Sequence, residues 1–131
     1  MSTPTPRSLG ALALLALIIA GCRGWTMDYG EPAAHVEAKD AAAIARRHLG
    51  EKIVVRGQVV SVDVSDAENC AVRLEEQVIA RFGAFERMAK EFEVGEVATI
   101  AGIVESVDAG VVILDPATGR DPLAPFEPDE P

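Results

Sequence analysis

The chain has 131 residues, enough for one domain, and 49% of them are hydrophobic, although an apolar amino-terminal stretch raises that share. Its formal net charge at pH 7 is −9. A phosphate backbone would be repelled, and the counterion release that drives nonspecific nucleic-acid binding would be weak, so this class of function is disfavoured.

The amino-terminal segment has the pattern of a secretory signal. It carries Arg7 and then an uncharged apolar run over residues 9–20. The run is about a dozen residues long, whereas a helix that crosses a bilayer needs roughly 20. A cleavable signal peptide over residues 1–21 is therefore favoured over a permanent transmembrane anchor.

The tetrapeptide Ile19-Ala20-Gly21-Cys22 ends this run, with an aliphatic and two small residues before a cysteine. It resembles the lipobox of bacterial lipoproteins. The resemblance implies cleavage between Gly21 and Cys22 and lipidation of the nucleophilic Cys22 sulfur, which would anchor the chain in a membrane through two or three acyl chains. The alternative is an ordinary buried cysteine. With Cys22 lipidated, Cys70 alone remains and no intramolecular disulfide can form.

Arg23 follows the cysteine, in place of the aspartate that similar lipoproteins use for inner-membrane retention. The resemblance thus implies a cell-envelope location, on an outer membrane and facing the periplasm if the organism has two membranes. Cleavage removes one basic and no acidic residue, so the mature side chains sum to (12 − 1) − 21 = −10. Residues 22–35, which contain two glycines and a proline, are predicted to form a flexible tether of roughly 20 Å.

Residues 35–49 are predicted to form a helix. Ala41, Ile44 and Ala45 recur at the spacings of a helical face. Acidic residues lie in the first turns and basic residues in the last, which suits the helix dipole. Gly50 then supplies the expected carboxyl-terminal stop.

Two histidines of this segment raise the question of a metal site. His35 and His48 are accompanied by Glu37 and Asp40. On one helix the two histidines would lie on different levels and could not share an ion, so solvated helix residues are favoured. The sequence predicts no metal ion and no cofactor.

One seven-residue motif occurs twice and predicts two bent strands. Gly57–Asp63 reads Gly-Gln-Val-Val-Ser-Val-Asp, and Gly102–Asp108 reads Gly-Ile-Val-Glu-Ser-Val-Asp. A glycine in mid-strand weakens packing unless the strand bends or a neighbour comes close. In the first strand the apolar positions change face near Gly57, which predicts a bulge or a strong coil there. Two long bent strands indicate a small closed barrel.

Shorter patterns complete the domain. Residues 70–75 and 78–82 alternate with period two and are predicted strands, as are residues 98–104, while the apolar run 111–114 is a predicted central strand. Residues 85–92 show the spacing of a short amphipathic helix.

Two features of these elements have competing interpretations. Cys70 falls on an inward-facing position, which favours a small buried residue over a reactive thiol. Phe85, Met88 and Phe92 could line an aromatic ligand site, but at helical spacing a plug for the open end of the barrel is favoured.

Three strands, a helix and two further strands form the order of the OB-fold. The expected fold class is mostly β: a five-stranded OB-fold Greek-key barrel over residues 36–119, with an N-terminal helix and a short helix between strands 3 and 4. The narrower likeness is carried by Lys52–Val59, Phe82, Val94–Glu96 and Ile100–Val104. Through these residues, the segment 51–119 resembles the bacterial tRNA_anti-like family, which occurs in exported proteins and lipoproteins. The resemblance implies no general activity.

Residues 120–131 have four of the eight prolines, four acidic residues and few apolar ones. Because such a segment cannot sustain a core, it is predicted to be a disordered acidic tail.

The function predicted from these features is a lipid-anchored cell-envelope binding module, whose partner is an envelope protein. The candidate ligand face is the outer side of strands 2 and 3, with Arg73, Glu75 and Arg81, and the alternative for each residue is a solvated sheet face. A second hypothesis is a stress-protective or structural lipoprotein that binds cations or cationic partners weakly. No motif of a hydrolase, kinase or metalloenzyme is present, so an enzyme is not expected.

Oligonucleotide binding is the third hypothesis and is disfavoured. Residues 52–119 contain six basic against twelve acidic residues. OB-folds that bind single strands combine a basic groove with exposed aromatic side chains, and the second and third strands offer no outward aromatic.

Overall fold

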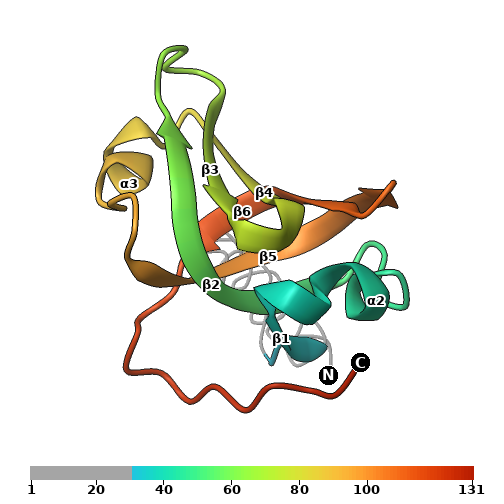
Figure 1. Cartoon of the computed structure of the whole chain (residues 1–131). Coiled ribbons are helices and arrows are strands. Elements are labelled where there is room, and N and C mark those ends of the chain that lie inside the picture. Colours follow the sequence, from blue (N-terminus) through green and yellow to red (C-terminus); the bar gives the residue numbers. More distant parts are fainter. Residues whose placement is uncertain (1–30) are drawn as a thin grey trace, which may run out of the picture. The chain divides into compact units, whose positions relative to one another are not determined.

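The two strands that contain the repeated motif are the long curved strands of a closed barrel (Figure 1). The structure is a computed structural model, and it describes residues 31–131. Its strands are β1 (Ala34–Glu37), β2 (Lys52–Asp63), β3 (Cys70–Leu74), β4 (Val78–Gly83), β5 (Val97–Asp108) and β6 (Val111–Gly119). Its α-helices are α2 (Ala41–Ala45) and α3 (Glu86–Lys90), and single 3-10 turns occur at η1 (Ala38–Asp40) and η2 (Glu75–Gln77).

The strand order is that of an OB-fold. Hydrogen bonds link the strands in the order β1-β2-β3-β4-β6-β5, and β5 also pairs with β2, which closes a barrel of five strands. Within the barrel only β4 and β6 run parallel. The short helix α3 lies between the third and fourth barrel strands, so the predicted fold class is confirmed.

Both repeated glycines allow close approaches that a side chain would block. A Cβ atom at Gly57 would lie 2.6 Å from the Cβ of Ala38 in η1. One at Gly102 would lie 2.8 Å from the Cβ of Leu114 and 3.1 Å from the carbonyl oxygen of Pro116, both in β6. Of the two reasons given for a glycine in mid-strand, a bend or a close neighbour, the close neighbour is thus found at both positions.

The predicted bulge in β2 is present. The pairing of β2 with β3 shifts between Val59 and Ser61, and Val60 is left 45% exposed. Beyond the bulge, Val62 and Val64 turn back and pack on the core. The bulge thus changes which residues face inward.

The predicted helix over residues 35–49 is wrong in its first part. Ala34–Glu37 is a strand, β1, which pairs in parallel with β2, and ordered structure begins inside the predicted tether. The edge of β2 offers hydrogen bonds to this segment, and Ala34 and Val36 are buried there with period two. Within the predicted range only residues 38–45 are helical, as η1 and α2, so the prediction is also wrong for residues 46–49. Ala41, Ile44 and Ala45 of α2 join the core as the helical spacing predicts.

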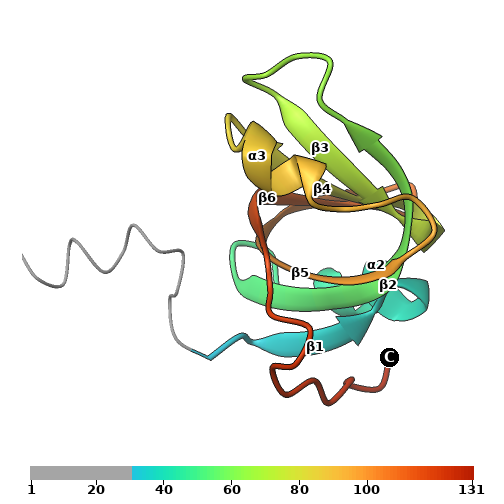
Figure 2. The same cartoon turned by 90° about the vertical axis from the view of Figure 1, so that its left-hand side faces the viewer.

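The two helices cover different parts of the barrel. In α3, Ala89 is fully buried, and α3 packs against β3 and β4. α2 packs against β1, β5 and β6, and Figures 1 and 2 place it on the side of the barrel away from α3. The barrel interior is apolar, with Val104 1% exposed and Phe82 2% exposed.

Residues 120–131 form no helix or strand. They leave the end of β6 and cross in front of β5, β2 and β1 in the view of Figure 2. The disorder predicted from their composition stays a prediction, which hydrogen exchange can test.

The predicted signal peptide, the cleavage site at Gly21 and Cys22 and the lipidation of Cys22 lie outside the described residues. Within residues 31–131, none of the helices has the length and apolar character needed to cross a membrane.

Candidate functional site

The outer side of β3 and β4 carries two of the three residues predicted for a ligand face. In the strand register, Arg73 lies opposite Ile79, and Ala71 lies opposite Arg81, so these four side chains share one face. Arg73 and Arg81 are exposed. In β3 and β4 no aromatic side chain points outward, since Phe82 is buried.

The three residues predicted for the ligand face do not act together, because Arg81 and Glu75 interact with other parts of the barrel. Arg81 donates to Glu105 at 3.2 Å and lies 3.9 Å from Asp115, so carboxylates of β5 and β6 compensate its charge. Glu75 lies in η2, past the end of β3, and its Oε1 accepts a hydrogen bond from the backbone N–H of Gln58 at 3.2 Å. Arg73 is then the one cation of this face that has no acidic partner among the described residues. A single exposed cation makes a weak binding site.

The loop beside this face is acidic and ordered by its own side chains. The hydroxyl of Ser65 donates to Asp63 at 2.6 Å, its backbone N–H donates at 3.0 Å, and these bonds lower the pKa of Asp63. Hydrogen bonds from Asn69 and the Glu68 backbone lower the pKa of Asp66 in the same way. Both carboxylates stay ionised, which further disfavours a phosphate ligand here.

Cys70 is the small buried residue that the alternation predicts. It is 1% exposed, and its thiol lies 3.6 Å from the carbonyl oxygens of Asp66 and Ala67. Burial raises the pKa of the Cys70 thiol, with nearby carboxylates such as Glu86 adding to the shift. A reactive thiolate is therefore disfavoured at this position.

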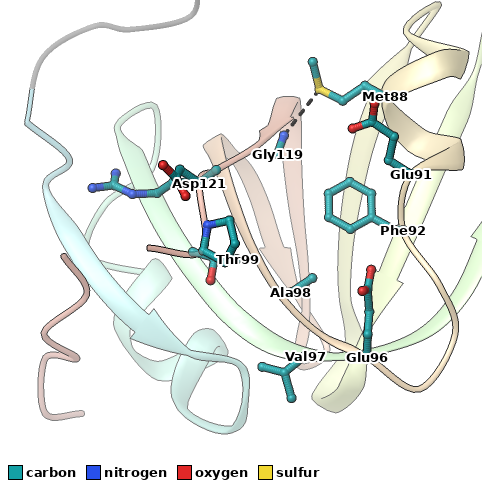
Figure 3. A pocket seen from close by; sticks show the side chains of 11 residues that line it. Met88, Glu91, Phe92, Glu96, Val97, Ala98, Thr99, Gly119 and Asp121 are labelled. Carbon is teal, nitrogen blue, oxygen red and sulfur yellow. Dashed lines mark hydrogen bonds between the residues drawn. The ribbon is translucent and has the colours of Figure 1, made fainter. Parts of the chain in front are cut away.

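A pocket of about 410 Å³ lies elsewhere, where three parts of the chain meet (Figure 3). One wall comes from α3 and the residues after it, one from the start of β5, and one from the end of β6 and the chain beyond it. Its lining residues are Met88, Glu91, Phe92, Glu96, Val97, Ala98, Thr99, Gly119, Arg120, Asp121 and Pro122.

The apolar wall of the pocket is tied to the barrel core. The ring of Phe92 meets the ring of Phe82 edge-on, with centroids 5.6 Å apart. The backbone N–H of Gly119 donates to the sulfur of Met88 at 3.4 Å, the dashed line of Figure 3, and joins α3 to β6. Met88 and Phe92 pack on the core, as the interpretation of this helix as a plug requires, and both also line the pocket. Phe85 is 55% exposed and does not line it.

The polar lining is mainly acidic. Glu91, Glu96 and Asp121 supply three carboxylates, against the one cation Arg120. One oxygen of Glu96 accepts a hydrogen bond from the N–H of Glu93 at 2.8 Å and one of Asp121 from the N–H of Leu123 at 2.9 Å, so each keeps one oxygen for a ligand. Figure 3 shows Glu91 and Glu96 on the same side of the pocket as the Phe92 ring, with Asp121 on the facing side. An aromatic ring flanked by carboxylates is a suitable environment for an organic cation.

The turn before β5 is held firmly in position. The backbone N–H of Val59 donates to the carbonyl of Glu96, and the N–H of Gly95 donates to the carbonyl of Val59, both at 2.8 Å. Val97, which lines the pocket, and Val94, which comes just before the turn, are each 67% exposed.

The sequence did not identify this pocket. Glu91 and Glu96 read as ordinary charged residues of a helix and a turn, and Asp121 as part of a tail. The only local signal was the spacing of Met88 and Phe92, since the facing wall lies some thirty residues further along the chain.

No protein-family model matches the chain, and no curated protein matches it. Membership of the tRNA_anti-like family therefore stays a prediction. Among solved structures, the chain is similar to a lipoprotein from Klebsiella pneumoniae subsp. pneumoniae that is described as a candidate nucleic acid-binding lipoprotein. The two are 22% identical, with a TM-score of 0.46 over 63% of this chain and 80% of that chain. Because this similarity is low, the fold is assigned from the strand order and not from the comparison.

Proposed function

We propose that this chain is a lipid-anchored, non-enzymatic binding module of the cell envelope, and that its pocket receives a basic side chain of a partner protein. The observation that carries the proposal is the pocket between α3, β5 and the end of β6, in which the Phe92 ring adjoins the carboxylates of Glu91 and Glu96. A lysine or arginine side chain has the matching chemistry, because an apolar stem ends in a cation.

The charge of the whole chain supports a cationic partner. The formal net charge of −9 would attract a basic protein and repel a nucleic acid. Val97, which is 67% exposed and lines the pocket, adds apolar contact area there. The proposed partner surface is therefore a basic side chain within an apolar patch of an envelope protein.

The proposal can be tested with defined probes. The lipidated chain in nanodiscs of neutral lipid would be titrated with acetyl-Gly-Lys-Gly-amide and with the glutamate analogue. We expect the methyl signals of Met88, Val97 and Ala98 to shift with the lysine peptide only. Shifts spread over the whole acidic surface would instead favour weak, nonstoichiometric cation binding. Affinity for a single-stranded oligonucleotide that falls with salt would favour the third hypothesis.

Neutralising the pocket should weaken this binding. In the double variant Glu91→Gln and Glu96→Gln, we expect about tenfold weaker affinity for the lysine peptide, since two exposed charge pairs contribute up to ~1 kcal/mol each. The matched control is Glu68→Gln with Glu76→Gln, which makes the same charge change at exposed positions outside the pocket. Equal losses in the two double variants would contradict a specific site.

Lipid anchoring has its own test. The variant Cys22→Ser removes the sulfur that would carry the lipid, so we expect loss of labelled palmitate and accumulation of the unprocessed precursor. Cys70→Ser is the control, because Cys70 is buried inside the domain and lies far from the signal segment in the sequence. Palmitate that still enters Cys22→Ser would contradict the lipobox assignment.

A further inference from the structure

The last ten residues, 122–131, form a strap over the outside of the barrel. Just before them, the N–H of Arg120 donates to the carbonyl of Thr99 in β5 at 3.0 Å. The Phe126 ring then lies 4.2 Å from the guanidinium carbon of Arg56 in β2. The N–H of Asp129 finally donates to the carbonyl of His35 in β1 at 2.7 Å. Residues 120–131 thus run from β5 past β2 to β1, as the course of the chain in Figure 2 also shows, and the strap itself contacts β2 and β1.

The surface along this path is buried, although it is the outer side of the barrel. Val54 is 0% exposed and Ala101 is 7% exposed, yet neither belongs to the interior core. The register places Val54 opposite Ala101 on one side and opposite His35 on the other. Since these positions point away from the barrel interior, their burial requires a cover on the outer side, and the strap contacts Arg56 of β2 and His35 of β1, which lie beside Val54.

One aromatic anchor, Phe126, and three hydrogen bonds with His35 hold the strap, and the N–H of His35 donates one of them to a carboxylate oxygen of Asp129 at 3.1 Å. Arg56 donates from Nε to the hydroxyl of Thr99 at 3.0 Å, which fixes its guanidinium beneath the Phe126 ring. His35 also contacts the anchor, with ring centroids 5.5 Å apart, and its Nδ1 accepts a hydrogen bond from the N–H of Glu127 at 3.2 Å. In contrast, Leu123 is 91% exposed. Few buried contacts and a proline-rich, acidic composition are features of a segment that opens locally.

The anchor is coupled to the pocket by a short connection. Arg120, Asp121 and Pro122 line the pocket, and Asp121 then starts a tight turn by accepting hydrogen bonds from the N–H groups of Leu123 and Ala124. From Pro122 to Phe126 the chain can span at most about 14 Å, so the position of the ring restricts the position of this wall.

We infer that the strap is releasable and that its docking through Phe126 holds the Arg120–Pro122 wall of the pocket in place. The inference rests on the proposed function for the part that concerns the ligand. A docked strap preorganises the pocket, so strap docking and the binding of a basic side chain favour each other.

The test compares Phe126→Ala with Leu123→Ala in the full lipidated chain. Both variants shorten an apolar side chain of the same segment, but only Phe126 contacts the barrel. In Phe126→Ala we expect at least tenfold faster hydrogen exchange at the amides of Glu127 and Asp129, altered methyl signals of Met88 and Ala98 without ligand, and at least threefold weaker binding of acetyl-Gly-Lys-Gly-amide. Leu123→Ala should leave the methyl signals unchanged, and it should alter the exchange rates and the peptide affinity by less than twofold.

Two results would overturn the inference. Exchange in Phe126→Ala that equals the wild type would show that the ring does not hold the strap. Faster exchange with unchanged Met88 and Ala98 signals would show that the strap does not position the pocket wall. If the wild-type chain does not bind the lysine peptide, the proposed function fails, while exchange and the ligand-free methyl signals still decide whether the strap sets the wall.

Discussion

Val104→Asp should prevent the domain from folding. Val104 is 1% exposed in β5 and lies opposite Leu114 of β6 in an interior made of apolar side chains. A carboxylate there would have no partner, and an unpaired buried charge is among the most destabilising of single changes, at about 4 kcal/mol or more. Thermal unfolding followed by circular dichroism would measure the effect as loss of the cooperative transition.

The same substitution on the same strand supplies the control. Val97 is 67% exposed, so Val97→Asp should change stability by no more than about 0.5 kcal/mol. If Val104→Asp kept the wild-type melting temperature, the strand register that places Val104 inside the barrel would be wrong, and the faces assigned to β5 would be reversed.

Gly57→Ala should destabilise the barrel by about 2 kcal/mol, because the added Cβ would lie 2.6 Å from the Cβ of Ala38. Both atoms are fixed to backbone, so neither can move aside by rotating a side chain. The cost should depend on Ala38 itself, and denaturant unfolding of a double-mutant cycle with Ala38→Gly would measure that dependence.

The cycle has a defined outcome. Ala38→Gly alone should cost roughly 0.5–1 kcal/mol through added backbone freedom. In its background, Gly57→Ala should cost at least ~1 kcal/mol less than in the wild type, because the clashing methyl group is gone. Additive costs would show that the loss at Gly57 comes from strand conformation and not from the approach of η1.

The binding hypothesis changed more than the fold. Arg73 and Arg81 share the outer face that the alternation predicted, but carboxylates of β5 and β6 occupy Arg81, and Glu75 bonds to the backbone of β2. We propose the acidic pocket as the site because its charge agrees with the charge of the whole chain. This proposal combines two hypotheses drawn from the sequence, a cationic partner and a protein partner, at one surface.

Local pattern by itself determined the barrel. Alternation placed β3, β4 and β5, helical spacing placed Ala41, Ile44 and Ala45, and the repeated glycines marked where neighbours come close, because each signal lies within one element and reports its own burial. Residues 34–37 were misassigned since four residues carry too little periodicity to outweigh an adjoining helical pattern.

Only the tertiary structure decided the pocket and the strap. The pocket joins Phe92 with Asp121, and the strap joins His35 and Arg56 with Phe126, so each brings together residues far apart in the chain. Such contacts depend on how the barrel closes and where β6 ends. No local period records them, because the pairing of distant segments is set by strand order and register.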